Sequence, residues 1–355
     1  MIRCCRLSLI HTMTLSKKPL KESVMKETIL NERDARGEWS PGMAIGASPL
    51  FQWPIKPLEI FKWLLGYPGY IFPWIGFFML IPIFTWFFLT PDLNSMKILE
   101  ADWIAFVYFR NLVILFLIAG GFHFRLYVQK AQDIRFKFNK NWLLKNHSGF
   151  LFRNQTWDNI FWSSVSGCGF WTAYEVLTYW AFANELIPML NWESNSVYFV
   201  LIYFAVHPIR EIHFYFVHRL LHWKPLYKNA HYLHHKNVNI GPWSGLAMHP
   251  IEHLLYFTGV FFHWIILSHP LHIIFHLQHA ALTAAYGHTG FEKLEVSKNL
   301  TIPKASDYFH YLHHRYFECN YGGGTFPLDK LFGSFHDGSD EANEIIRKRR
   351  KKIGN

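Results

Sequence analysis

Histidine stands out in this sequence, because the chain has 22 histidines, as many as it has glycines. Nineteen of the 22 lie between His207 and His336. Three clusters there repeat a spacing, one as HxxxH and two as HxxHH with the same Tyr-Leu filler, and a further histidine stands in a Gly-His-Thr-Gly segment. The histidines of these motifs are His218, His222, His231, His234, His235, His288, His310, His313 and His314.

These spacings predict metal ligation. Residues three or four positions apart share one face of a helix, so the imidazoles of one cluster can reach one ion. One ion takes about four to six ligands, so this many imidazoles predict two ions. Nitrogen ligands favour iron, zinc, copper or nickel over magnesium or calcium. His249, Glu252 and His253 are further candidates, either as ligands or as groups that orient the ligands.

The composition excludes several other classes of protein. A chain that is 51% hydrophobic, 19% aromatic and only 17% charged is not disordered. Its 4 cysteines lie far apart or adjacent, without a CxxC, which excludes a thiolate zinc site and a disulfide-stapled domain. The net charge is +10, but no basic patch is interleaved with aromatics in a soluble domain, so no nucleic-acid partner is expected.

The elements that must position the histidines are predicted to be membrane helices. A helix needs roughly 20 apolar residues to cross the hydrocarbon of a bilayer. The four stretches that approach this length are Ile71–Thr90, Trp103–Phe124, Ile160–Phe182 and Ser196–Val217. Two shorter apolar runs, Leu254–Leu267 and Leu271–Gly287, flank the turn-forming Ser268-His269-Pro270 and predict a hairpin that dips into the membrane. On this hairpin, His272, His276 and His279 share a helical face and are expected to line a cavity or to bond one another.

The charges of the loops predict the orientation of these helices. Lysines and arginines gather before the first stretch, between residues 125 and 145, and at the C-terminus. Because such loops stay in the cytoplasm, the histidine clusters are expected on the cytosolic face. The predicted fold is all-α: a polytopic membrane helix bundle of about four spanning helices plus the hairpin, with a cytosolic histidine-lined dimetal cap. The predicted divisions are an N-terminal arm (1–58), three membrane helices (59–195), a histidine-bearing domain (196–340) and a basic tail (341–355).

The motifs resemble those of the fatty acid hydroxylase/sterol desaturase superfamily. The resemblance rests on the HxxxH, the two HxxHH clusters, His249-Pro-Ile-Glu252, His288-Thr-Gly290 and the segment Asn320–Ser334. It covers roughly Phe199 to Asp337, so residues 196–340 correspond to a catalytic domain of this type. Two departures stand out: Ala284 replaces a histidine found in some members, and Pro327-Leu328 stands where the family often has a tryptophan.

The resemblance implies a membrane-bound, O₂-dependent oxidoreductase with two iron ions, held by the histidines of the motifs. It implies hydroxylation, desaturation or epoxidation of a lipid at the cytosolic face, with electrons from NAD(P)H through a separate carrier such as cytochrome b5 and its reductase. It also implies a multi-pass protein, in the endoplasmic reticulum if the organism is a eukaryote. His249-Pro-Ile-Glu252 favours a sterol or another isoprenoid substrate, and the alternative is a fatty acyl or sphingolipid substrate.

Two other classes of function remain open from the residues themselves. A histidine-lined membrane metal carrier would place its ligands at the midplane on discontinuous helices, whereas these clusters follow the predicted membrane exits. A zinc hydrolase would need a carboxylate beside the metal, as in HExxH, which is absent from the sequence. Both are weaker interpretations than an oxygenase, and no catalytic residue beyond the metal ligands is predicted.

Overall fold

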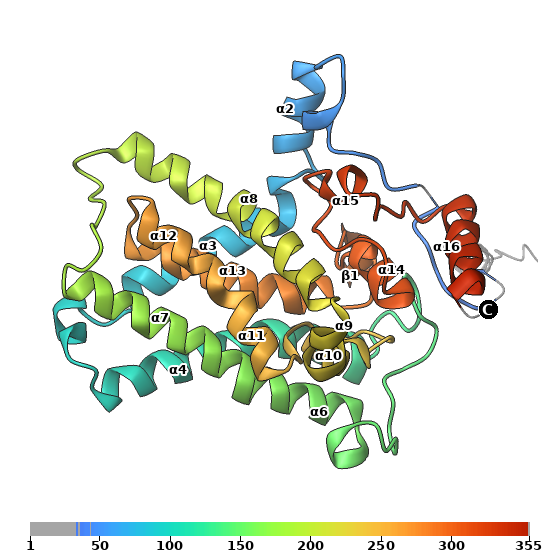
Figure 1. The fold of residues 1–355 in the computed structure, drawn as a ribbon, viewed down its shortest axis with the longest axis horizontal. Coiled ribbons are helices and arrows are strands. Elements are labelled where there is room, and N and C mark those ends of the chain that lie inside the picture. The colour runs from blue at the N-terminus through green and yellow to red at the C-terminus, as the bar shows by residue number, and fades with distance from the viewer. Residues whose placement is uncertain (1–32, 35, 43, 354–355) are drawn as a thin grey trace, which may run out of the picture.

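The computed structural model describes residues 33–34, 36–42 and 44–353, and in this part the chain is mostly helical (Figure 1). The helices are α2 (Pro57–Leu65), α3 (Gly76–Phe88), α4 (Ala101–Leu115), α5 (Gly121–His123), α6 (Gln155–Phe161), α7 (Cys168–Ala183), α8 (Ser196–Leu221), α9 (Lys224–Leu226), α10 (Tyr232–His235), α11 (Pro250–Tyr256), α12 (Phe262–Ile265), α13 (Pro270–Gly287), α14 (Tyr308–Tyr316), α15 (Leu328–Leu331) and α16 (Asp340–Ile353). Turns of π-helix extend several of them, at Ile71–Ile75, Phe116–Gly120, Phe124–Val128, Trp162–Gly167 and Tyr227–His231.

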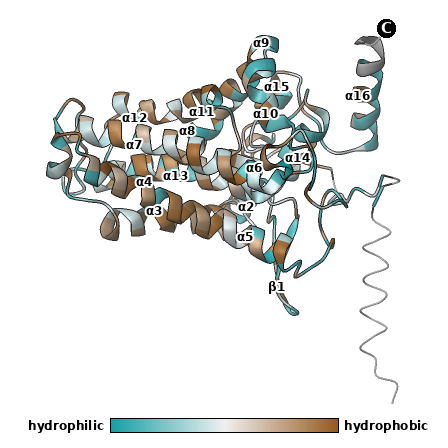
Figure 2. Cartoon of the chain, turned by 90° about the horizontal axis from the view of Figure 1, so that it is seen from below, coloured by the Kyte–Doolittle hydropathy of each residue, from teal (hydrophilic) through white to brown (hydrophobic). Residues whose placement is uncertain are grey.

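The long helices form a bundle around α13, which packs against α3, α7 and α8. Of its 18 residues, 16 are buried. Two helical segments, Ile71–Phe88 and Ala101–Val128, are long and apolar enough to cross a membrane, judged by length and composition. Figure 2 shows that this bundle is mostly hydrophobic, whereas the elements at its other end, such as α15 and α16, are mostly hydrophilic.

The predicted apolar stretches are all helical in the structure. The first two correspond to the membrane-capable segments, the third to the continuous run of α6 and α7, and the fourth to α8, which begins at Ser196 as expected. The hairpin turn also lies where it was predicted, because α12 ends at Ile265 and α13 begins at Pro270. The third and fourth stretches do not reach the apolarity of a spanning helix by the same measure, so the predicted number of spans stays a prediction.

Charged residues inside the bundle bond one another. The Arg110 guanidinium on α4 donates to the carboxylate of Glu175 on α7, with N and O 2.5 Å apart. Tyr179 Oη donates to the same oxygen, Oε1, at 2.6 Å, and Asn111 Nδ2 donates to Oε2 at 2.9 Å. A buried ion pair is tolerated only when its remaining polar atoms are also bonded. This arrangement explains how two apolar stretches can carry charges near their middles.

The hydrophilic end of the molecule differs from the all-α prediction, because it contains a two-stranded sheet. Strands β1 (Lys293–Ser297) and β2 (Leu300–Pro303) pair antiparallel, with Leu294 opposite Ile302. Within the predicted N-terminal arm, the structure describes residues 33–34, 36–42 and 44–58, and the other residues of the arm lie outside the described part of the chain. Trp39 of the arm packs on Phe138 in a cluster that includes residues of α14. Arg315 on α14 forms ion pairs with Asp34 and Glu38 of the arm.

Candidate metal centre

The last turn of α8 positions the HxxxH motif. His218 and His222 lie four residues apart at its C-terminal end, so both rings point from one face of the helix. The chain then turns at Trp223, and α9 begins with a proline in its first turn, where the missing N–H costs no hydrogen bond. The π-helical turn Tyr227–His231 and α10 follow at once and carry the first HxxHH motif back toward α8.

The second HxxHH motif lies on α14, a buried helix with defined caps. Asp307 is its N-cap, and one carboxylate oxygen accepts a hydrogen bond from His310 N at 3.3 Å. At its C-terminus, Phe317 adopts a left-handed conformation with a φ of 66°. His288 follows α13 directly as its C-cap residue. The two caps therefore fix the segment on which His310, His313 and His314 stand.

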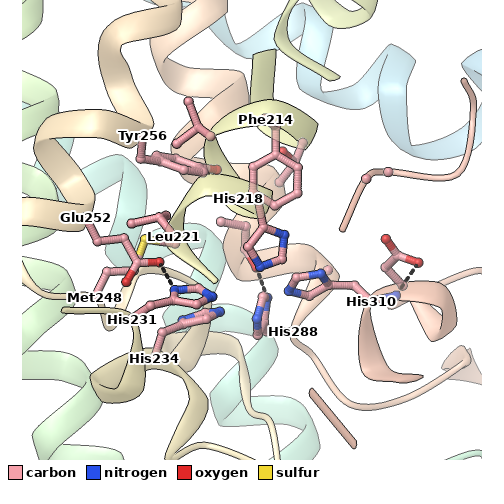
Figure 3. A pocket seen from close by; sticks show the side chains of 18 of the residues that line it. Phe214, His218, Leu221, His231, His234, Met248, Glu252, Tyr256, His288 and His310 are labelled. Atoms are coloured by element: carbon pink, nitrogen blue, oxygen red, sulfur yellow. Dashed lines mark hydrogen bonds and ion pairs between the residues drawn. The ribbon is translucent and has the colours of Figure 1, made fainter. Parts of the chain in front are cut away.

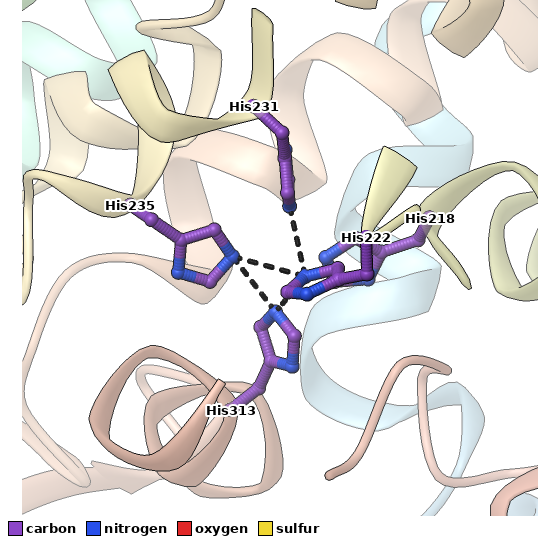
Figure 4. Close-up of side chains that lie close together, drawn as sticks. All are labelled: His218, His222, His231, His235 and His313. Atoms are coloured by element: carbon purple, nitrogen blue, oxygen red, sulfur yellow. Dashed lines mark hydrogen bonds between the residues drawn. The ribbon is translucent and has the colours of Figure 1, made fainter. Parts of the chain in front are cut away.

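The nine motif histidines form two groups, in each of which the potential ligand atoms lie within 4.8 Å of one another. The five-histidine group consists of His218, His222, His231, His235 and His313, and the four-histidine group consists of His234, His288, His310 and His314. Figure 4 shows the rings of the five-histidine group converging from the end of α8, from the π-helical turn with α10, and from α14. These are the nine residues that the spacing singled out, and the structure brings all of them together.

Each HxxHH motif is divided between the two groups. His231 and His235, four residues apart, belong to the five-histidine group, whereas His234 belongs to the other. Likewise, His310 and His314 belong to the four-histidine group, whereas His313 belongs to the five-histidine group. The spacing had predicted that all histidines of one motif lie on the same side of a helix and reach one ion. Neighbouring helical residues project about 100° apart, so the HH pair of each motif points to two different sites.

The ring nitrogens show which atoms are free to bind a cation. His313 Nδ1 lies 2.6 Å from the carbonyl oxygen of Cys319, which can only accept, so Nδ1 carries the ring proton. His313 Nε2 is then a lone pair, yet it lies 3.1 Å from His222 Nε2 and 3.0 Å from His235 Nε2. His222 Nε2 also lies 3.1 Å from His231 Nε2 and 3.2 Å from His235 Nε2, so three ring nitrogens surround it, and a single N–H can point at only one of them. The donor set therefore fits a cation among these nitrogens.

The four-histidine group has the same chemistry. His288 Nδ1 lies 2.8 Å from the carbonyl oxygen of Ala284, so its Nε2 is a lone pair, and it faces His314 Nε2 at 3.0 Å. Within the described residues, the buried Nδ1 atoms of His234 and His314 have no hydrogen-bond partner. Position 284, where some members of the superfamily have a histidine, thus contributes a carbonyl that orients His288.

Burial keeps these imidazoles in the form that binds metal. His231, His235 and His314 are buried, and desolvation of the charged form, followed by neighbouring imidazoles, lowers the pKa of each well below its ordinary value. The rings are therefore neutral at pH 7. Only the neutral ring offers a nitrogen lone pair to an ion.

Of the three additional candidates, only Glu252 contacts a motif histidine. Glu252 Oε1 lies at hydrogen-bond distance, 2.8 Å, from His231 Nδ1, and burial raises the pKa of Glu252 well above its ordinary value. His253 instead bonds Ser166 Oγ at 2.9 Å and the Leu246 carbonyl at 3.2 Å. His249 is the N-cap of α11 and accepts from Ile251 N at 3.2 Å. Neither of these two histidines belongs to the two groups.

The histidines of the predicted hairpin bond one another or the backbone. His279 Nε2 lies 2.9 Å from His207 Nδ1 on α8, and His276 Nδ1 lies 3.1 Å from His263 Nε2. His272 Nε2 bonds the carbonyl oxygen of Phe199 at 3.0 Å. Each of these three rings thus bonds a partner outside the set of three, whereas the sequence predicted that His272, His276 and His279 line a cavity or bond one another.

A cavity of about 60 Å³ touches both histidine groups. Figure 3 shows Phe214 and Tyr256 on one side of it and the imidazoles of His231, His234 and His288 on the other. Arg210 and Asp307 also line it, and sequence reasoning had assigned neither residue to the site. Arg210 was visible only as a charge interrupting the fourth apolar stretch. Asp307 carried the signal of a helix N-cap three residues before His310.

Comparisons with known proteins cover this same region. Residues 200–334 match the family model described as fatty acid hydroxylase. The Delta(7)-sterol 5(6)-desaturase of Candida glabrata is 29% identical over 171 residues, which are 48% of this chain and 46% of that protein. The Delta(7)-sterol-C5(6)-desaturase of Nicotiana tabacum is 30% identical over 47% of this chain and 60% of its own. Methylsterol monooxygenase 1 of Gallus gallus is 28% identical over 41% of this chain and 50% of its own.

The chain thus aligns with about half the length of these curated relatives. No solved structure matches it. The matched residues contain α8 from its second turn, both HxxHH motifs and every histidine of the two groups. Residues 200–334, which hold both histidine groups, therefore match the fatty acid hydroxylase family and are similar to sterol desaturases.

Proposed function

We propose that this protein is an O₂-dependent lipid oxidoreductase that holds two iron ions and acts on a sterol or a related isoprenoid lipid. The observation that carries the proposal is the pair of histidine groups, whose nitrogen lone pairs converge beside one shared cavity. The relatives named above, whose printed activities concern sterols, support the substrate class. The chemistry is hydroxylation, desaturation or epoxidation.

Iron is the metal proposed because an unactivated C–H bond needs redox chemistry, and iron bound by these imidazoles would supply the activation of O₂. The protein's own contribution is orientation and exclusion of water. The carbonyl oxygens of Tyr321, Cys319 and Ala284 fix three rings through Nδ1, at 2.8, 2.6 and 2.8 Å respectively. Phe214 and Met248 give the shared cavity an apolar wall.

The site residues proposed as ligands are the nine members of the two groups, and Glu252 is proposed to orient His231. We propose that the site lies on the cytosolic face of a multi-pass membrane protein, in the endoplasmic reticulum if the organism is a eukaryote. The basic residues of the loops would attract an acidic electron carrier, such as cytochrome b5 fed by NAD(P)H and its reductase. A fatty acyl or sphingolipid substrate is the second candidate, favoured by the description of the matching family model.

The test compares lipid extracts of one host that expresses the wild type, His234→Ala or His147→Ala. His234 belongs to the four-histidine group, whereas His147 is exposed and outside both groups, so it controls for loss of a histidine as such. We expect an oxidised sterol from the wild type and from His147→Ala, and none from His234→Ala. Iron is measured on the purified proteins alongside. Identical sterol and fatty-acid profiles in all three strains would contradict the proposal.

A further inference from the structure

Arg210 is a cation in an apolar helix, and its side chain faces the cavity beside the two histidine groups. It lies within the stretch predicted as the fourth span, where an ionisable residue is costly and is a candidate for a functional role. Among the described residues it forms one hydrogen bond, in which its guanidinium donates to Tyr256 Oη at 2.6 Å, and no ion pair. Tyr256 Oη in turn donates to the Ala280 carbonyl at 2.7 Å. Most of the donors of Arg210 are therefore available to a ligand.

Asp307 lines the same cavity and supplies the opposite kind of group. One of its carboxylate oxygens caps α14, and it belongs to the walls around His288 and His310. A hydroxyl group needs a donor for its oxygen and an acceptor for its proton. Arg210 and Asp307 offer these two groups across one small cavity. A carboxylate ligand would find the donor of Arg210 but would be repelled by Asp307.

The position of Arg210 limits the distance between the histidine groups and a ligand hydroxyl that is bound to Arg210. Its guanidinium lies 4.7 Å from the ring centre of Phe214, and that ring stacks on His218 with centres 4.9 Å apart. The guanidinium and the His218 ring are thus separated by about 10 Å at most. A lipid whose polar end is bound at Arg210 presents to the histidine groups a carbon only a few bonds from that end.

We infer that Arg210 and Asp307 bind the hydroxyl group of the substrate. This rests on the proposed function and adds the two residues that recognise the polar end of the lipid. A sterol has its only polar group at one end of a rigid ring system, which matches a cavity that admits just a few atoms and holds one donor and one acceptor. The hydroxyl is therefore expected to contribute to the affinity for the substrate.

The experiment measures binding of two probes to the full-length protein in lipid nanodiscs: a Δ7-sterol with its 3-hydroxyl, and the same sterol without the 3-oxygen. Loss of a hydrogen bond to a charged group lowers affinity about tenfold or more. We expect the wild type to prefer the hydroxylated probe by about tenfold or more, and Arg210→Met to bind both probes within about threefold. Because each variant is compared with itself, a general loss of stability does not produce this result.

Arg219→Met is the matched control. Arg219 lies on the same helix, donates to a tyrosine hydroxyl, that of Tyr215, at 2.5 Å, and stacks on Phe332, but it does not line the cavity. We expect this variant to keep the wild-type preference and iron content. A wild type that binds and oxidises both sterols equally would overturn the inference and leave the proposed function standing. A wild type that binds no sterol, but binds a long-chain fatty acid through Arg210, would overturn both.

Discussion

A neutral imidazole offers one nitrogen to an ion and one N–H to a neighbour, so the neighbour decides which nitrogen points inward. At His218, His288 and His313 the neighbour is a backbone carbonyl, which a side-chain substitution does not remove. At His231 it is the carboxylate of Glu252, 2.8 Å away and buried. Glu252 is therefore the one of these four partners that mutation can test directly.

Replacing Glu252 by alanine is expected to weaken metal binding by the five-histidine group. Such partners of metal-bound histidine contribute about 10- to 100-fold in metal affinity. Glu252→Gln keeps an oxygen that can accept the His231 proton and is expected to lose much less. The measurement is bound metal per chain during titration with a chelator, with the exposed Glu185→Ala as the control. Wild-type metal retention by Glu252→Ala would show that the contact does not orient His231.

At the scale of elements, apolar runs predicted the long helices, because burial in a bundle or a bilayer demands continuous hydrophobic residues. The start of α8 at Ser196 and the turn before α13 followed from the sequence. The strands Lys293–Ser297 and Leu300–Pro303 did not, because two short segments give little periodic signal. The division of each HxxHH motif between two groups also escaped prediction, since it depends on how α10 and α14 face each other.

The contribution of the contact between α4 and α7 to the stability of the protein can be measured. Arg110 and Glu175 are both buried, so Glu175→Leu leaves a buried, unpaired guanidinium and is expected to cost about 3–5 kcal/mol of stability. The double variant Arg110→Met/Glu175→Leu removes both charges and is expected to be more stable than Glu175→Leu alone. Thermal unfolding in detergent measures this. A double variant as unstable as the sum of the two single variants would indicate that the residues do not act as a pair.

The whole molecule places its histidine groups where the hydrophobic bundle meets the hydrophilic end. The end of α8, the end of α13 and the start of α14 meet there, and α13 connects the centre of the bundle to His288. Figure 2 shows the change from hydrophobic to hydrophilic elements along the molecule. If the proposed function holds, the lipid would approach from the bundle and the proposed electron carrier from the hydrophilic side, so the two would not share one route.

Because both HxxHH motifs serve both groups, we expect the two proposed ions to depend on each other. His288→Ala/His310→Ala removes two members of the four-histidine group and none of the other. Without an ion, His234 and His314 of the four-histidine group would lose their fixed positions. Because they directly adjoin His235 and His313 in the sequence, these two ligands of the five-histidine group would then be displaced as well. We expect metal analysis to find less than one ion per chain rather than one. One full ion per chain, with His147→Ala retaining two, would show that the groups bind metal independently.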